Sequence, residues 1–418
     1  MTENGSREHD STRVDDRVEA VRAHPPLDSR GRRTAPWFAV ATLAYAAVLS
    51  SALAVAIPEA ALVGDPEWGL DYRVYARAGR ELWTPALYAP RPELPFLYPP
   101  IAGMLFAALR FIPEALGHAV LNIATVAATV TTAHHVLAWY DFGTRAQRHA
   151  LAFAAAGLFS LTTPWRTELA LGQINSLLLA AIVIAATRTG DRARDGVLLG
   201  AATSIKLAAG IVVPGFLLAR RWRTAAGAVL TFLVTVAVGV LVLGGTAVRY
   251  WFEVLPRMSN GPVRTEVFSQ NLAAALSRLG LAPPLGWGLL AVLTVIGLSI
   301  AVRRRDHFKA VLVLGMAGLL AQPVTWTHHW VWLGPAALVL LIGVVRCAHP
   351  YRWACCLVLL LGTILFPVGY ALPGHSLSGS GLDLGRALPA SGYALLGLAL
   401  LVLIPLCPTG RRPQDAST

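Results

Sequence analysis

The sequence predicts an all-α polytopic membrane protein whose chain crosses the lipid bilayer many times. Of its 418 residues, 55% are hydrophobic and only 14% are charged, whereas soluble proteins carry about a quarter charged residues. The mean hydropathy is +0.57. Apolar runs of roughly the 20 residues needed to span a bilayer recur from Trp37 almost to Pro408. These observations predict one transmembrane domain over residues 36–408, with about 10–12 membrane segments.

The two ends of the chain are polar. Residues 1–35 carry many charges of both signs, which predicts a disordered cytoplasmic tail. They lack the apolar core and the small-residue cleavage site of a signal peptide. Residues 409–418 are expected to form a second cytoplasmic tail.

The formal net charge of +12 comes mostly from arginines placed between apolar runs. Basic residues tend to stay on the cytoplasmic side of membrane proteins, so this charge does not indicate a nucleic-acid partner, and we expect none. The cysteines lie in or beside apolar segments without the paired spacing of a zinc site, and they are interpreted as packing thiols. They are Cys347, Cys355, Cys356 and Cys407.

The apolar runs follow one another with short polar connections. They lie at residues 36–57, 98–112, 115–139, 148–163, 169–187, 196–219, 224–244, 285–302, 308–322, 329–346, 353–372 and 391–407. A full crossing for every run would put the arginines of loops 141–148 and 188–194 on the outside, against the positive-inside tendency.

Two of these runs are weak spans. Residues 98–112 are short and begin with YPP, and residues 196–219 contain both Lys206 and Pro214. If each is re-entrant or a pair of short helices, the arginine-rich loops all lie inside, with about ten full crossings and both termini cytoplasmic. Broken helices at membrane depth are tolerated where they are buried or line a cavity. The sequence therefore predicts a cavity.

The same topology assigns five segments to the outer face of the membrane. They are residues 58–97, 164–175, 245–284, 323–329 and 373–390. The four longest of them hold most of the polar residues other than arginine, so we expect the chemistry of the protein on this side.

Asp71 lies in the stretch GLDYRVYARAG of the first outer segment. Val74, Ala78 and Leu82 follow it at helical spacing, which predicts an amphipathic interfacial helix with Asp71 near its start. The helix dipole favours a carboxylate at that place, which is a structural explanation. The same position, at the boundary between water and lipid, also suits a general base.

His328 and His329 lie in THHWVW at the outer end of an apolar helix. One interpretation is an aromatic belt with incidental histidines. The other is a histidine that transfers protons or binds phosphate. A shared metal ion is disfavoured because adjacent residues point about 100° apart on a helix.

Lys206, in TSIKLAAG, is an ammonium group well inside an apolar run. Its long side chain could extend to the membrane surface. Ionisable groups at membrane depth more often face a cavity or pair with an anion, and a phosphate is the natural counter-ion. Arg264 is the outer arginine expected to contact an anionic partner.

The amides Gln173 and Asn175 begin an apolar run in LGQINSLLLA, and Asn271 ends the similar motif FSQN. Amides can join membrane helices to one another, and they can also bind sugar hydroxyls. The chain has no P-loop, GxGxxG, GxSxG or paired DxD motif, so a nucleotide-linked donor is not expected.

Taken together, these motifs resemble glycosyltransferase family 87 of the GT-C superfamily. The resemblance covers roughly residues 37–346. It is carried by DYRVYARAG, FLYPPIAGMLFAAL, LGQINSLLLA, SIKLAAGIVVPGFLLARRWR and QPVTWTHHWVW, in the order in which the family has them.

The resemblance implies a GT-C-type helical bundle with an outward-facing catalytic cavity in the cell membrane. It implies transfer of mannose, with inversion, from polyprenyl-phosphate mannose to a lipid-linked glycan, in α-1,2 linkage. Asp71 would be the base and His328 or His329 the essential histidine. Lys206 and Arg264 would hold the donor phosphate, with no metal ion and no cofactor. The residues expected to bind sugars or other parts of the substrates are Gln173, Asn175, Asn271, Tyr75 and Tyr98.

Two alternatives remain open from the sequence. One is transfer of arabinofuranose or another pentose from a polyprenyl-phosphate donor. The other is a transporter or flippase of lipid-linked glycans, which would be expected to show internal repeats and ionisable groups near mid-membrane. The sequence shows no such repeat, and its ionisable groups cluster at outer helix ends.

Overall fold

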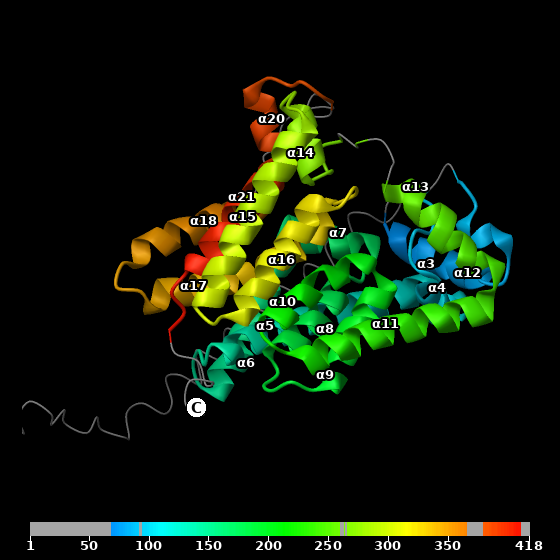
Figure 1. Cartoon of the computed structure of the whole chain (residues 1–418), viewed down its shortest axis with the longest axis horizontal. Coiled ribbons are helices and arrows are strands. Elements are labelled where there is room, and N and C mark those ends of the chain that lie inside the picture. Colours follow the sequence, from blue (N-terminus) through cyan, green and yellow to red (C-terminus); the bar gives the residue numbers. More distant parts are fainter. Residues whose placement is uncertain (1–67, 92–93, 260–262, 264–265, 366–378, 411–418) are drawn as a thin grey trace, which may run out of the picture.

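The computed structural model describes residues 68–91, 94–259, 263, 266–365 and 379–410. Within these ranges the regular elements are all helices, and the one isolated β-bridge joins Ser269 to Trp326. Figure 1 shows the helices packed side by side along most of the chain. The predicted all-α membrane protein is confirmed.

Four described helices are long and apolar enough to cross a membrane. They are α5 (Glu114–Trp139), α11 (Trp222–Leu243), α15 (Pro283–Arg303) and the continuous pair of η5 (Thr327–Trp332) and α17 (Leu333–Arg346). Two sharply bent pairs raise this number to six if each is one span: α7 (Thr163–Leu171) with α8 (Asn175–Thr187), and α20 (Leu384–Ala390) with α21 (Gly392–Leu406). The predicted segment 36–57 lies outside the described residues, so the total of 10–12 stays a prediction.

The second weak span is broken, as the sequence predicts, and the first is a single short helix. The first consists of α4 (Pro100–Phe106) and η2 (Ala107–Phe111). These helices together rise about 18 Å, short of the roughly 30 Å of a hydrocarbon core. In the second, α9 (Ala193–Ile205) ends at Lys206, and η3 (Leu207–Val212) and α10 (Val213–Leu218) follow. The remaining long elements are α6 (Arg145–Ser160), α16 (His307–Ala321) and α18 (Pro350–Leu365).

Small residues let α9 pack tightly against α11. A Cβ atom added to Gly196 would lie 2.0 Å from the carbonyl oxygen of Thr224, and one added to Gly227 would lie 2.2 Å from that of Ala193. Glycine at such contacts allows two membrane helices to approach backbone to backbone. This contact holds the start of α9, the helix that ends at Lys206.

The loops that carry the arginines meet at one end of the molecule. Arg346 donates hydrogen bonds to the carbonyl oxygens of Asp141, at 2.8 Å, and Thr409, at 2.6 Å. Arg221 donates to the carbonyl oxygen of Ala185 at 2.9 Å. The loops predicted to share one side of the membrane therefore do lie together.

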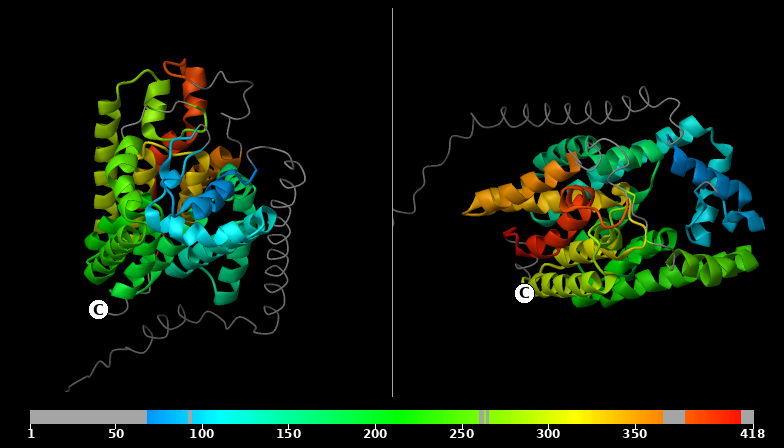
Figure 2. Two further views of the ribbon diagram at one scale, coloured as in Figure 1. Left: turned by 90° about the vertical axis from the view of Figure 1, so that its right-hand side faces the viewer. Right: turned by 90° about the horizontal axis from the view of Figure 1, so that it is seen from above.

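The segments predicted to face outward also contact one another. The backbone N–H of Gln270 donates to Thr325 at 2.6 Å, and its side-chain amide donates to the carbonyl of Ala390 at 2.7 Å. Figure 1 shows α14 (Leu272–Arg278) beside α20, away from the loops that carry the arginines, and Figure 2 gives two further views of the same arrangement.

The helices near the start of the described chain form a group of their own. Figure 1 places α3 (Leu70–Glu81) and α4 beside α12 (Gly245–Arg249) and α13 (Leu255–Ser259). A π-helical turn, η4 (Tyr250–Val254), connects α12 to α13, and the short helix η1 (Pro85–Tyr88) follows α3. Tyr250 is buried against Tyr88, with ring centroids 5.1 Å apart. Aromatic contacts of this kind hold the first outer segment against the outer segment 245–284.

Candidate active site

Helix α3 carries Asp71 in its first turn, as predicted. The helix begins after Gly69, whose left-handed φ of 69° turns the chain and whose N–H donates to the carbonyl of Ala170 at 2.8 Å. Asp71 and Tyr75 lie on the same face and are buried, with 6% and 0% of their surface exposed. The Asp71 side chain is therefore packed against the other helices, and its position at the boundary between water and lipid stays a prediction.

A sharp bend positions the amides Gln173 and Asn175. The apolar run 169–187 is not one helix: α7 and α8 meet at 118°. Gly172 takes a left-handed φ of 71° after the last residue of α7, and the N–H of Gln173 then closes the helix end on the carbonyl of Glu168 at 2.9 Å. This is a common way for a helix to end. Asn175 is the first residue of α8, as expected from the sequence.

Glu168 is a buried residue of the site that the sequence reasoning missed. Its Oε1 accepts a hydrogen bond of 2.6 Å from the N–H of Ser176, in the first turn of α8. The side chain is completely buried, and Oε2 has no hydrogen-bond partner among the described residues. A carboxylate five residues before Gln173 in a chain with few acidic groups is the signal that could have identified it.

Two tyrosine hydroxyls link α3 to the bend. The Tyr75 hydroxyl lies 2.9 Å from that of Tyr98 and donates to Gln173 Oε1 at 3.0 Å. Tyr98 lies 3.4 Å from the same oxygen. The structure thus brings together three residues that are predicted to bind substrate, from three separate segments.

Lys206 lies at the break after α9 and reaches the same region. Its Nζ donates to Asn175 Oδ1 at 2.7 Å and lies 5.8 Å from the centre of the Tyr98 ring. Lys206, Asn175 and His329 line a cavity of about 40 Å³. The prediction that Lys206 faces a cavity is confirmed.

The two histidines differ in their surroundings. His329 Nδ1 accepts a hydrogen bond of 2.9 Å from the N–H of Trp326, and the side chain lines the cavity beside Lys206. His328 is 1% exposed, and its Nε2 has no partner among the described residues. The carbonyl of His328 accepts from the Asn175 amide at 3.4 Å. Of the two histidines, His329 therefore lines the cavity that Lys206 also lines, and His328 does not.

Burial raises the pKa of Asp71 to about 6, and a hydrogen bond from Gln173 and the positive charge of Lys206 reduce this rise. One carboxylate oxygen, Oδ2, is buried without a hydrogen-bond partner among the described residues. Asp71 is ionised at neutral pH, close to its pKa, which is the condition under which a carboxylate works best as a general base.

Two predicted site residues lie elsewhere. Asn271 caps α14: its Oδ1 accepts from the N–H of Ala274 at 2.7 Å, and its amide donates to the carbonyl of Pro323 at 2.8 Å. These two hydrogen bonds hold the loop that leads to the histidines. Among the described residues, no hydrogen bond joins the Asn271 side chain to Asp71 or to the residues around it. Arg264 lies outside the described residues.

No metal centre is formed by the part of the chain that the structure describes: it contains no group of three or more His, Cys, Asp or Glu side chains placed to hold an ion. The four cysteines are free thiols. The carboxylates of Asp71 and Glu168 instead lie near Lys206.

The Asp71 carboxylate can accept a proton and the Lys206 ammonium group can stabilise an anion. In the structure, however, the polar groups around them contact one another. The space beside Lys206, about 40 Å³, is far smaller than the roughly 300 Å³ or more of typical ligand pockets. A cavity of about 340 Å³ lies against a different face of α3, beside Arg77. A sugar-sized molecule therefore does not fit beside Lys206 unless the tyrosine, amide and lysine side chains separate.

The sequence model of glycosyltransferase family 87 matches residues 96–323. This range contains Tyr98, Gln173 and Lys206, whereas Asp71 and the two histidines lie on either side of it.

Curated relatives extend the similarity further along the chain. A polyprenol-phosphate-mannose-dependent alpha-(1-2)-phosphatidylinositol pentamannoside mannosyltransferase of Mycolicibacterium smegmatis is 33% identical over 316 residues, 70% of this chain and 75% of the relative. Its namesake from Mycobacterium tuberculosis is 32% identical, over 66% of this chain and 67% of its own length. A polyprenol-phosphate-mannose-dependent alpha-(1-2)-phosphatidylinositol mannoside mannosyltransferase of M. smegmatis is 27% identical over 84% of this chain and 86% of its own. The chain therefore belongs to glycosyltransferase family 87.

Proposed function

We propose that this protein transfers mannose from polyprenyl-phosphate mannose to a lipid-linked glycan of the phosphatidylinositol mannoside class, forming an α-1,2 linkage with inversion. The names of the similar enzymes support the donor, the acceptor class and the linkage. The observation that carries the chemistry is the buried Asp71 carboxylate, which has one oxygen without a partner among the described residues and lies within electrostatic reach of Lys206.

In this reaction Asp71 takes the proton of the acceptor hydroxyl as its oxygen attacks C1 of mannose. The bond from C1 to the phosphate oxygen breaks at the same time, and polyprenyl phosphate leaves as an anion. Attack from the side opposite the leaving group inverts C1. The ammonium of Lys206 neutralises the charge that develops on the phosphate, which is the kind of electrostatic stabilisation that contributes most to many enzymes.

The other clustered residues bind the substrates. His329 lies on the wall of the Lys206 cavity and donates to the phosphate. Gln173 and Asn175 exchange their present partners for sugar hydroxyls, and so do the hydroxyls of Tyr75 and Tyr98. Arg264 remains an expected phosphate contact, and Asn271 acts through the loop before the histidines.

The proposed active site faces the extracytoplasmic side of a multi-pass protein of the cell membrane. This orientation is supported by the arginine-bearing loops, which lie together at the end where Arg346 contacts Asp141 and Thr409. Basic loops of this kind stay in the cytoplasm. A lipid-linked donor then supplies activated sugar where nucleotide sugars are absent.

The test is a membrane assay with radiolabelled polyprenyl-phosphate mannose and a phosphatidylinositol mannoside. Asp71→Asn keeps the size of the side chain and removes the base, so we expect transfer to fall about 10²- to 10⁴-fold. Asp383→Asn is the matched control, because Asp383 is an exposed cap of α20 and asparagine caps helices equally well.

Each departure from this result has a meaning. Wild-type transfer by Asp71→Asn would show that Asp71 is not the base. Activity with polyprenyl-phosphate arabinose but not with the mannose donor would support pentosyl transfer. Movement of a lipid-linked glycan across proteoliposomes, without transfer to it, would support a flippase.

A further inference from the structure

A basic surface at the start of helix α11 takes no part in the proposed chemistry. It is formed by residues 188–195, around the start of α9, and by residues 220–224, around the start of α11. These two segments hold six arginines and two aspartates, which gives a formal charge of +4. Both belong to the loops that the sequence predicts on the cytoplasmic side, and Lys206 follows the other end of α9.

Asp191 holds the two segments together. Its Oδ2 accepts a hydrogen bond of 2.9 Å from the N–H of Arg223, and its Oδ1 accepts bonds of 2.8 and 3.0 Å from the N–H and the hydroxyl of Thr224. The Thr224 hydroxyl also lies 3.3 Å from the carbonyl oxygen of Arg192. Figure 1 shows α9 beside α11. Arg192 and Arg223 therefore lie next to each other, although they come from different loops.

Three arginines of this surface present their charge to the outside. Arg192, Arg220 and Arg223 are exposed, and their side chains make no ion pair with another described residue. The nearby Asp195 is paired instead with Arg188, at 2.9 Å. The carboxylate of Asp191 is a single charge against three, so the surface keeps a net positive charge.

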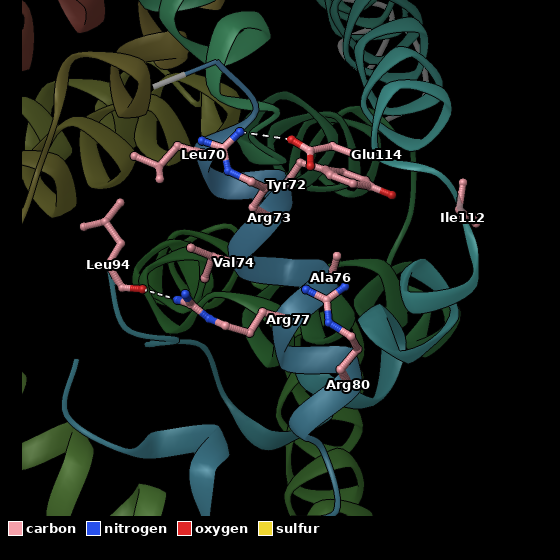
Figure 3. Close-up of a pocket in the computed structure, with 10 residues that line it drawn as sticks. All are labelled: Leu70, Tyr72, Arg73, Val74, Ala76, Arg77, Arg80, Leu94, Ile112 and Glu114. Carbon is pink, nitrogen blue, oxygen red and sulfur yellow. Dashed lines mark hydrogen bonds and ion pairs between the residues drawn. The ribbon is translucent and has the colours of Figure 1, made fainter. Parts of the chain in front are cut away.

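The arginines of α3 differ in this respect. Figure 3 shows Arg73 beside Glu114 and Arg77 beside Leu94, and the contacts are 3.0 Å to the Glu114 carboxylate and 2.5 Å to the Leu94 carbonyl. Those guanidinium groups bind parts of the protein itself. The surface at α11 is therefore the better candidate for an external anion.

An apolar stripe continues from this basic surface along α11. Trp222 is the first residue of α11 and is 61% exposed. Val229 and Leu233 follow it by seven and eleven residues and are also exposed. At about 100° per residue, all three lie on one side of the helix. Eleven residues rise about 16 Å, close to half of the roughly 30 Å of a hydrocarbon core. The stripe therefore has the length of one leaflet.

This combination matches the chemistry of an anionic phospholipid. Guanidinium groups present paired N–H donors to phosphate oxygens, and acyl chains cover exposed apolar side chains of a helix that is apolar enough to cross a membrane. Tryptophan is common at the boundary between headgroups and acyl chains. A soluble polyanion would use the arginines and leave the stripe uncovered, while a neutral lipid would use the stripe alone.

We propose that the start of α11 binds an anionic phospholipid of the cytoplasmic leaflet. Arg192, Arg220 and Arg223 hold its phosphate, Trp222 packs where the headgroup meets the acyl chains, and the chains lie along α11. Basic clusters at the cytoplasmic end of a membrane helix attract anionic lipids in this way. The inference concerns a lipid that is neither donor nor acceptor, and it does not rest on the proposed transfer of mannose.

The test titrates the full-length protein in detergent with brominated phosphatidylglycerol, because bromine quenches the fluorescence of a nearby tryptophan. The difference between wild type and Trp222→Phe isolates the signal of Trp222. The variant is Arg192→Gln with Arg220→Gln and Arg223→Gln. We expect it to weaken the binding about a hundredfold, which corresponds to about fivefold for each charge.

The matched control removes three other exposed arginines from the predicted cytoplasmic side: Arg303, Arg305 and Arg352, each replaced by glutamine. Arg305 has a left-handed φ of 53°, close to the 57° of Arg220, so both variants place glutamine in the same backbone conformation. Charges outside the site act only through a screened field, so we expect the control to bind within about twofold of wild type. Equal losses in both variants would show general attraction to net charge and would contradict the site.

Two further probes examine the headgroup and the stripe. We expect brominated phosphatidylcholine to quench Trp222 only at much higher concentration, and inorganic phosphate not to displace the bound phosphatidylglycerol. Equal affinity for the two lipids would refute recognition of an anionic headgroup. Displacement by inorganic phosphate would show that the acyl chains contribute nothing. If Trp222→Phe is quenched as strongly as wild type, the lipid binds elsewhere and the proposal is wrong.

Discussion

Lys206 Nζ donates a hydrogen bond of 2.7 Å to Asn175 Oδ1 and so joins the break after α9 to the start of α8. The amide of Asn175 is neutral, so it does not compensate the positive charge of the ammonium group. The Asp71 carboxylate is near enough to be affected by that charge. One cation thus lies beside both the proposed base and the proposed leaving group.

Replacing Lys206 tests this arrangement. Lys206→Gln can still donate to Asn175 but has no charge, so we expect donor kcat/KM to fall about 10²- to 10³-fold, the loss typical of one charge-stabilising group. Steady-state kinetics with varied donor measure it. Arg194→Gln, at an exposed arginine in the first turn of α9, serves as control and should leave kcat/KM unchanged. Equal values for Lys206→Gln and wild type would rule out the role in phosphate stabilisation.

The pH dependence of the reaction should follow Asp71. Its pKa of about 6 is higher than the ordinary value of 3.8, and only the ionised carboxylate can accept a proton. We therefore expect kcat/KM to be constant above about pH 7 and to fall about tenfold per pH unit below pH 6. The residual activity of Asp71→Asn should lack this fall. A profile of wild type that stays flat down to pH 5 would be incompatible with Asp71 as base.

The two histidines should differ in their importance. His329 lines the Lys206 cavity, while His328 is buried against neighbouring rings. We expect His329→Asn, which can still accept from the Trp326 N–H, to lower transfer about 10²-fold or more. His328→Asn should act mainly through folding, so its purified, folded fraction should retain most activity. Transfer rates normalised to folded protein measure both, and the reverse order would assign the essential role to His328.

The bend between α7 and α8 depends on Gly172. Its φ is +71°, and an added Cβ would lie 2.9 Å from His118 Cδ2 and 3.0 Å from Tyr72 Cβ. Gly190 has a similar φ of +81° with no atom within 4 Å of an added Cβ. Both alanine variants should lose about 1–2 kcal/mol from backbone strain, and Gly172→Ala should lose more because of the contacts. Thermal unfolding in detergent compares them, and equal losses would show that the bend tolerates a side chain.

Glu168 should be more important for the start of α8 than for its own charge. Glu168→Gln keeps an oxygen for the N–H of Ser176, whereas Glu168→Ala removes it. We expect the alanine variant to be less stable than the glutamine variant by about 0.5–2 kcal/mol, the range for loss of a helix cap. Unfolding temperatures and transfer rates of both variants provide the measurement. If the two variants are equally stable, the capping interaction contributes nothing.

Much of the fold could be predicted because apolar length and charge determine it. Lys206 and Pro214 interrupt an apolar run, and the chain breaks at Lys206 as expected. Asp71 with its apolar residues at helical spacing predicted α3. The bend at Gly172 could not be predicted in the same way, because residues 169–187 form one continuous apolar run and a single glycine does not necessarily end a helix.

The candidate site could be predicted as a set of residues but not as a shape. Motif order grouped Gln173 with Lys206, yet the hydrogen bonds between segments depend on tertiary packing. Burial of the Asp71 face depends on that packing as well. Asn271 was expected to bind sugar because amides do so, although a polar residue before a helix is equally suited to cap it. The arginines of α3 were part of an expected polar face, and their cavity arises only from residues that come later in the sequence.

The hydrogen bonds of Arg346 to Asp141 and Thr409 also restrain the end of the molecule at which they lie. They tie a loop from the first half of the chain to the last described residues, at the end away from Asp71. Two parts of a structure that are held together at one end separate more readily at the other end. We therefore expect a sugar that enters beside Lys206 to displace side chains at that end of the molecule while these hydrogen bonds keep the opposite end together.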